Sequence, residues 1–143
     1  MNFTKPIAFL LILGFFINAT YIADTKVELV EYENYDDGHV IKAYLITPIN
    51  LPRLEQQAVI YSHGMGTWEE KKQEGVGLGI ELAKKKYVVL YPDARNGLEY
   101  PTRTGASDLH WGARFLRQNT NFNIQKIGCM GSSYGNLAVF DLV

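Results

Sequence analysis

The sequence predicts an α/β protein in which a mostly parallel sheet is covered by helices on both faces. Short apolar runs of the kind that forms buried strands lie at residues 58–61 and 87–91, and a further apolar run lies at residues 127–130. The segments between these runs have the apolar spacing of helices. Alternation of strand and helix after an initial hairpin is typical of a parallel sheet packed between two helical layers.

The composition and the N-terminus indicate one exported domain. The chain has 143 residues, 47% of them hydrophobic, and a formal net charge of −1, which argues against nucleic acid as a partner. Lys5 precedes an apolar segment at residues 7–17, and Ala19 and Ala23 are small residues at suitable cleavage positions. We therefore expect a signal peptide over residues 1–23 and a periplasmic or extracellular protein. A membrane partner is expected only if this segment stays uncleaved as an anchor.

Two strands are expected between residues 26 and 48, because apolar and polar side chains alternate there. Asp36-Asp37-Gly38 separates the two strands as a turn signal. The polar residues 50–57, which include Pro52, predict a surface loop before the strand at 58–61.

The next helix is expected to begin at Thr67. Thr67 and Glu70 have the spacing of a capping box. The apolar face of this helix is formed by Val76, Ile80 and Ala83. Three alternating glycines, Gly75, Gly77 and Gly79, lower the helix propensity of this segment. A glycine series of this kind could also indicate a nucleotide-binding loop. Their spacing is wrong for that loop and no strand directly precedes them, so we exclude it.

The strand at residues 87–91 is followed by a long loop over residues 93–105, rich in glycine, proline and asparagine. Ser107 is expected to cap the helix that follows the loop. One face of that helix carries Leu109, Ala113 and Leu116. Cys129 is the only cysteine, so no intramolecular disulfide is possible, and its apolar surroundings favour a core position.

Gly131-Ser132-Ser133-Tyr134-Gly135 follows the last apolar run and precedes residues that suit a helix. Gly-x-Ser-x-Gly between a strand and a helix is the pattern of a nucleophile elbow. Gly131 and Gly135 are expected because a side chain at either position would clash with the neighbouring strand or helix. Ser133 would then lie at a helix N-terminus, where the amides favour developing negative charge. The alternative is a glycine- and serine-rich turn without chemistry.

This elbow, together with His63-Gly64 at the end of an earlier strand, resembles the α/β-hydrolase superfamily from about residue 27 onward. Gly-Ser-Ser-Tyr-Gly is most similar to the dienelactone-hydrolase and prolyl-oligopeptidase-like branches. Asp93-Ala94-Arg95-Asn96-Gly97 is similar to the Asp-x-Arg-Gly loop of the superfamily. The resemblance implies that residues 24–143 are the N-terminal part of an α/β-hydrolase domain.

The resemblance also implies roles for individual residues. Ser133 is the nucleophile, and the backbone amides of Met65 and Tyr134 form the oxyanion hole. His63 and Gly64 hold the oxyanion loop, so His63 is expected to be structural. No metal or organic cofactor is implied, and the partner is a small-molecule or peptide substrate.

The catalytic acid and histidine are expected after the serine in this fold. Asp141 is the only acid after Ser133, it lies on the helix that follows the elbow, and no histidine follows. Of the earlier groups, Asp93 and Asp108 precede the serine, and His39 and His110 are expected to be solvated or structural. The sequence therefore predicts an exported serine hydrolase for an ester, thioester or amide bond, in a form truncated before its acid and base. The alternative is a non-catalytic relative that binds a partner.

Overall fold

The structure is a computed structural model that describes residues 19–51, 56–118 and 121–142. Residues 7–17 of the expected signal peptide and Pro52 of the expected surface loop lie outside the described residues. Among the residues that are described, no helix is long and apolar enough to cross a membrane.

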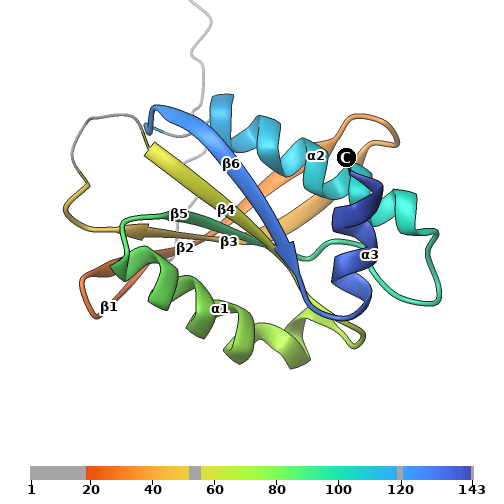
Figure 1. The fold of residues 1–143 in the computed structure, drawn as a ribbon, viewed down its shortest axis with the longest axis horizontal. Helices are drawn as coiled ribbons and strands as arrows, with labels where there is room; N and C mark the ends of the chain where they lie inside the picture. Colours follow the sequence, from red (N-terminus) through yellow and green to blue (C-terminus); the bar gives the residue numbers. More distant parts are fainter. Residues whose placement is uncertain (1–18, 52–55, 119–120, 143) are drawn as a thin grey trace, which may run out of the picture.

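Nine elements form one mixed sheet with helices on both sides (Figure 1). The strands, in the order β1-β2-β3-β5-β4-β6, are β1 (Ala19–Ile22), β2 (Thr25–Asn34), β3 (His39–Pro48), β5 (Val88–Pro92), β4 (Gln56–Ser62) and β6 (Ile124–Gly131). The helices are α1 (Trp68–Lys84), α2 (Thr102–Gln118) and α3 (Tyr134–Asp141). The α/β class with helices on both faces is confirmed, because α1 covers one face while α2 and α3 cover the other.

The pairing of the strands divides the sheet into two parts. β4 pairs in parallel with both β5 and β6. The pairings β1–β2, β2–β3 and β3–β5 are antiparallel. The parallel part contains the strands that alternate with helices, whereas the antiparallel part is built from hairpins. Because parallel strands end at the same edge, the last residues of β4, β5 and β6 lie along one side of the sheet.

The hairpin between β2 and β3 turns where the sequence predicts. Asn34 pairs with His39 across the turn, and Gly38 has a φ of +74°. β1 is an additional strand that the sequence did not predict. It joins β2 through Ala23 and Asp24, which both have positive φ.

Helix α1 begins with the predicted capping box. The Thr67 amide donates to Glu70 Oε2 (2.8 Å), and the Glu70 amide donates to Thr67 Oγ1 (3.3 Å). Two of its glycines are buried against the sheet. A Cβ on Gly75 would lie 2.2 Å from Cζ of Tyr91, and one on Gly79 would lie 2.2 Å from Cδ1 of Ile46. These glycines cost helix propensity, but they let the helix backbone pack directly on the strands.

Helix α2 differs from the prediction at its start. It begins at Thr102, so Ser107 lies inside the helix and is not its cap. The Ser107 hydroxyl instead accepts from Asn34 Nδ2 of β2 (2.9 Å). The expected apolar face is confirmed, since Leu109 and Leu116 are fully buried.

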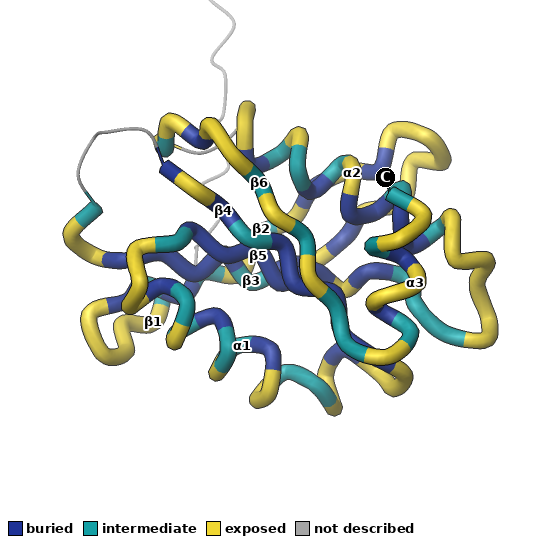
Figure 2. The backbone as a smooth tube through the Cα atoms, in the orientation of Figure 1, coloured by how far each residue is buried: buried dark blue, intermediate teal, exposed yellow. Residues whose placement is uncertain are grey.

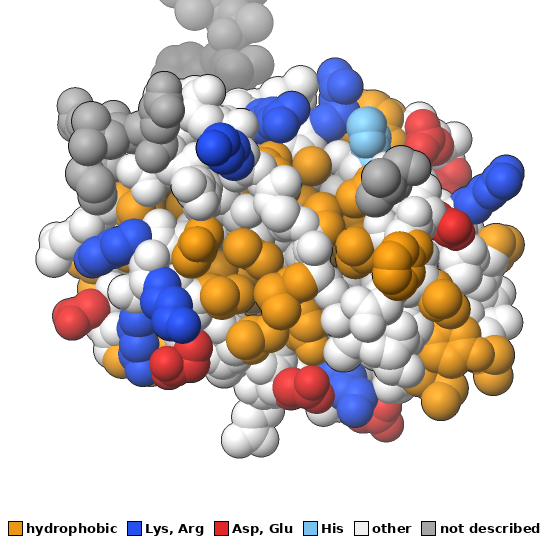
Figure 3. Space-filling view, viewed as in Figure 1, with side chains coloured by type: hydrophobic (Ala, Val, Ile, Leu, Met, Phe, Trp, Pro, Cys, Tyr) orange, Lys and Arg blue, Asp and Glu red, His pale blue; other side chains and the backbone are white. Residues whose placement is uncertain are grey.

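The buried residues form a core on each face of the sheet (Figure 2). At β6 the sheet ends in a strand whose outer edge has no described neighbour. Figure 3 shows hydrophobic side chains gathered over β6 and α3, where Met130, Leu137 and Phe140 are exposed.

Candidate active site

Ser133 occupies a strained turn between β6 and α3. Its φ is 47° and its ψ is −119°, a conformation that side-chain-bearing residues rarely adopt. Such a conformation costs about 1–3 kcal/mol and persists only where the surrounding structure enforces it. The residue is exposed at the edge of the sheet, directly before the first residue of α3. The turn therefore presents a serine hydroxyl to solvent at a helix N-terminus.

Three glycines surround this turn, and close packing requires two of them, Gly131 and Gly135. A Cβ on Gly131 would lie 2.5 Å from the Gly135 carbonyl carbon. A Cβ on Gly135 would lie 2.3 Å from the Ser62 carbonyl oxygen, so α3 begins in direct contact with the end of β4. A Cβ on Gly64 would lie 3.3 Å from the Ser133 Cβ. The loop after β4 therefore runs beside Ser133.

Hydrogen bonds fix the elbow to β4 and α1. The Ser132 amide donates to the Ser62 carbonyl (3.1 Å). The Tyr61 hydroxyl lies 3.2 Å from Ser132 Oγ and 3.3 Å from Glu74 Oε1. Tyr61 is buried on β4, so it links the elbow to α1 across the strand. Tyr61 is a site residue that the sequence analysis missed, and an apolar strand position carries no signal of such a contact.

His63 is buried beside the loop, with 3% of its surface exposed. Its Nδ1 lies 2.8 Å from the Gly64 carbonyl oxygen. A carbonyl can only accept, so Nδ1 carries a proton and donates it to this oxygen. This contact holds the ring against its own loop. Met65 follows on the same loop and is exposed.

The loop after β5 is anchored by an ion pair between Arg95 and Asp108. Asp108 Oδ2 accepts from the Arg95 amide (2.9 Å) and Nε (3.1 Å), and Oδ1 accepts from Nη2 (2.7 Å) and from Asn34 Nδ2 (2.7 Å). The Asp108 carboxylate is fully buried and raises the pKa of Arg95. Asp108 is thus committed to arginine, and it connects the predicted Asp-x-Arg loop to α2 and β2.

Asn96 of the same loop reaches the end of β4. Its Nδ2 donates to Ser62 Oγ (2.7 Å) and to the His63 carbonyl oxygen (3.4 Å). Asn96 was part of the loop that the sequence singled out, but its contact with β4 was not predicted. The loops after β4 and β5 are therefore held together beside the elbow.

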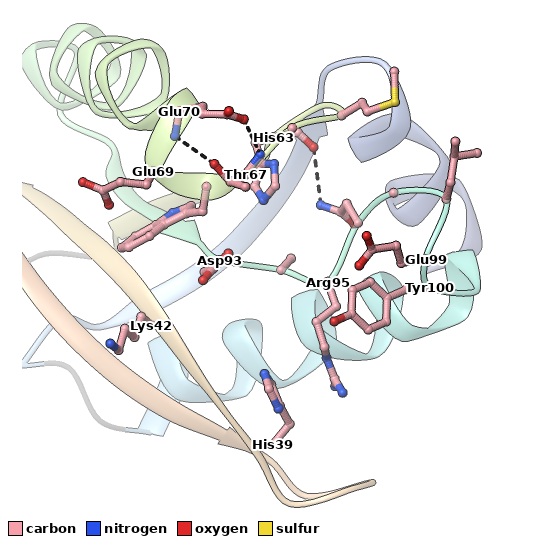
Figure 4. A pocket seen from close by; sticks show the side chains of 17 residues that line it. His39, Lys42, His63, Thr67, Glu69, Glu70, Asp93, Arg95, Glu99 and Tyr100 are labelled. Atoms are coloured by element: carbon pink, nitrogen blue, oxygen red, sulfur yellow. Dashed lines mark hydrogen bonds between the residues drawn. The ribbon is translucent and has the colours of Figure 1, made fainter.

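A cleft of about 730 Å³ opens between these two loops and β3 (Figure 4). The lining comes from β3, from the loop after β4 with the start of α1, and from the loop after β5. Its residues are His39, Lys42, His63, Met65, Gly66, Thr67, Trp68, Glu69, Glu70, Asp93, Ala94, Arg95, Asn96, Gly97, Leu98, Glu99 and Tyr100. Ser133 is not in this described lining. Two lining residues, His63 and Met65, flank Gly64, which packs beside Ser133.

The remaining acid and histidine candidates are dispersed. His39 lines the cleft, and His110 packs edge-on against Trp111 on α2. Asp141 bonds to the Thr102 hydroxyl at the end of α3. Asp93 is exposed, yet partial desolvation raises its pKa, while the nearby Lys42 acts to lower it. Among the described residues, no group of three or more metal-ligating side chains is close enough to hold a metal ion.

Solved structures that share this arrangement include several esterases. An esterase from Pyrococcus furiosus is 25% identical with a TM-score of 0.59, over 78% of this chain. An esterase from Pyrobaculum calidifontis is 25% identical with a TM-score of 0.62, over 80% of this chain. Brefeldin A esterase, a bacterial homologue of human hormone-sensitive lipase, is 20% identical with a TM-score of 0.63, over 82% of this chain. Over the matched part, the chain has the α/β-hydrolase fold and is related to that superfamily.

The chain matches only part of the length of these three esterases. The chain spans 44%, 38% and 34% of these three proteins, respectively. No protein-family model and no curated protein matches the sequence. The relationship is therefore carried by the fold, at the superfamily level.

Proposed function

We propose that this α/β-hydrolase domain belongs to a serine hydrolase that cleaves an ester, thioester or amide by acyl transfer, with Ser133 as nucleophile. The observation that carries this proposal is the strained conformation of Ser133 at the strand–helix turn, packed against Gly64 at the end of β4. A turn without chemistry has no need of a serine there, because glycine would occupy it without strain. Among the three bond types, the esterase names of the structural neighbours favour an ester.

In this mechanism the Ser133 oxygen attacks the substrate carbonyl while a base takes the hydroxyl proton. The backbone amides of Met65 and Tyr134 donate to the negatively charged oxygen of the tetrahedral intermediate. The base then returns the proton to the leaving group, and water releases the acyl group by the same steps. His63 holds the oxyanion loop, and its contact with the Gly64 carbonyl supports that role.

We assign the base and the triad acid to groups outside these 143 residues. No histidine follows Ser133 in the sequence. The Asp108 carboxylate is already occupied by Arg95, and Asp141 lies at the far end of α3. Ser133 of the chain alone is therefore expected to be positioned but not activated.

Hydrolysis of an aryl ester by the 143-residue chain tests this assignment, with Ser133→Ala as control. We expect equal, negligible rates in both proteins. Rapid turnover that disappears in Ser133→Ala would reveal a base within the chain, and His63→Ala would identify it. The coding DNA after Val143 tests the hydrolase proposal itself. A downstream frame with an aspartate and then a histidine supports it, and a clean stop supports a binding module.

We also propose that the protein is exported, from the Lys5-flanked apolar segment. Cleavage after Ala19 would keep most of β1, whereas cleavage after Ala23 would remove that strand. N-terminal sequencing of secreted protein should therefore begin near Thr20 or Asp24. Recovery of the intact Met1 terminus in the membrane fraction would contradict export and indicate an anchor.

A further inference from the structure

We propose that Tyr61 is a positioning residue for Ser133, and that its hydroxyl acts through the neighbouring residue Ser132. This inference deepens the proposed function and rests on it, because it concerns the geometry of Ser133 as a nucleophile. Tyr61 lies on β4, and only 4% of its surface is exposed. It is not among the described residues that line the cleft. Its side chain can therefore affect the reaction only through other residues.

The Tyr61 hydroxyl lies between polar groups of two different elements. It is 3.2 Å from Ser132 Oγ in the elbow and 3.3 Å from Glu74 Oε1 on α1. An ionised carboxylate can only accept, so the phenol donates its single proton to Glu74. The phenol oxygen is then left to accept a hydrogen bond from the Ser132 hydroxyl. These two contacts direct the Ser132 side chain toward β4.

Ser132 is held through its backbone as well as through its side chain. Its amide donates to the Ser62 carbonyl (3.1 Å), and its carbonyl accepts from the Gly135 amide (2.8 Å). Tyr61 holds the remaining polar group of this residue, the side-chain hydroxyl. The Ser132 carbonyl belongs to the peptide that leads into Ser133, whose φ of 47° persists only where the surrounding structure enforces it. The Tyr61 contact is therefore one of three that hold the residue from which the strained turn starts.

Ser132 also packs against the loop that carries the proposed oxyanion amide of Met65. A Cβ on Gly64 would lie 3.1 Å from both the carbonyl oxygen and Oγ of Ser132, and 3.3 Å from the Ser133 Cβ. A Ser132 side chain that rotated away from Tyr61 would disturb this packing. It would thereby change how the loop lies against Ser133. Tyr61 thus holds two parts of the proposed reaction geometry together, the nucleophile and the oxyanion loop.

A second buried tyrosine lies beside Tyr61 and provides a comparison. The Tyr61 ring stacks on Tyr91 of β5 with centroids 5.6 Å apart, and Tyr91 is fully buried. The Tyr91 hydroxyl has no hydrogen-bond partner among the described residues. Both rings therefore contribute to the same packing, but only the hydroxyl of Tyr61 is bonded to the elbow. Removing each hydroxyl in turn separates the effect of the hydrogen bond from the effect of packing.

Fluorophosphonate labelling of the 143-residue chain in imidazole buffer tests the inference, because imidazole can act as the base. Labelling over a range of probe concentrations gives the affinity for the probe and the maximal rate constant of attack separately. We expect Tyr61→Phe to lower the maximal rate constant about threefold to tenfold, the effect expected for the loss of one buried hydrogen bond. The affinity for the probe should not change, because Tyr61 is not in the described cleft lining. Tyr91→Phe is the matched control and should change neither quantity.

Ser132→Ala removes the same hydrogen bond from its other end and keeps Ser133. It should label Ser133 as slowly as Tyr61→Phe does, and the double variant should be no slower than either single variant, because the two side chains share one bond. Circular dichroism checks that each variant is folded, and Ser132→Ala decides alone if Tyr61→Phe does not fold.

The outcomes separate this inference from the proposed function. A maximal rate constant equal to that of the parent in Tyr61→Phe or in Ser132→Ala overturns the inference, and so does a loss that Tyr91→Phe shares. In these cases labelling of the parent at Ser133 still supports the proposed function. A folded parent protein that does not label at Ser133 rejects the proposed function, and the inference with it.

Discussion

Asp108→Asn should destabilise the fold severely, although the substitution changes neither size nor shape. The Asp108 carboxylate is fully buried and receives four N–H donors, three from Arg95 and one from Asn34 Nδ2. An asparagine amide has one acceptor oxygen, and its NH₂ group would face donors in place of the second oxygen. The substitution therefore leaves buried donors unsatisfied, and exposed Asp37 becomes the only charged partner of Arg95.

The expected loss follows from these contacts. Each unsatisfied buried donor costs about 1–3 kcal/mol, and breaking a buried ion pair by removing one partner costs about 3–5 kcal/mol. We expect a loss of about 3–5 kcal/mol, which is a large part of the roughly 5–15 kcal/mol that stabilises a typical domain. The corresponding drop in melting temperature is on the order of 10 °C or more.

Urea denaturation followed by circular dichroism measures this loss. Asp37→Asn is the matched control, because Asp37 contacts the same arginine (2.7 Å) from an exposed position. Arg95 lowers the pKa of Asp37 through this contact, but the control should have a much smaller effect because solvent screens an exposed pair. Equal midpoints for the wild type and Asp108→Asn would refute the structural role assigned to this pair.

Three further predictions concern packing and strain. Gly75→Ala should destabilise the fold by about 1–3 kcal/mol, because its Cβ would lie 2.2 Å from the Tyr91 ring. Gly77→Ala has nothing within 4 Å of its Cβ and should stabilise the fold by about 0.5–1 kcal/mol, so melting temperatures that shift in the same direction in both variants would contradict this account. Ser133→Gly should be more stable than Ser133→Ala by about 1 kcal/mol, since only glycine relieves the strain at φ 47°; equal melting temperatures would mean that the turn is unstrained. The 143-residue chain should be marginally stable and should self-associate through the exposed apolar face of β6 and α3, so Phe140→Asp should reduce the light scattering of its aggregates. A monomer with a cooperative thermal transition would contradict this prediction.

Features encoded by neighbouring residues could be predicted from the sequence. The capping box of Thr67 and Glu70 depends only on two residues three positions apart, so the predicted start of α1 is confirmed. The strand–turn–helix context of Ser133 is also local, because close-packed glycines flank the serine within a few residues. The order of the strands and helices from β2 onward followed from their periodicity for the same reason.

Features that depend on distant residues could not be predicted in this way. Ser107 has the character of a cap, but its hydroxyl is engaged by Asn34 on another strand, and α2 begins earlier. Gly75 and Gly79 are unfavourable in a helix when considered alone, and only their contacts with the sheet explain them. β1 is short and exposed, so it lacks the apolar pattern by which strands are recognised.

The assignment of Ser133 as a positioned nucleophile can be tested by supplying the missing base. Fluorophosphonate labelling of the chain would be measured with and without imidazole in the buffer, and the adduct mapped by mass spectrometry. Ser132→Ala is the matched control, since it changes the same side chain one position away in the elbow. We predict that imidazole accelerates labelling at Ser133, that Ser132→Ala still labels, and that Ser133→Ala does not. An adduct on Ser132, or no adduct at any imidazole concentration in folded protein, would contradict the assignment.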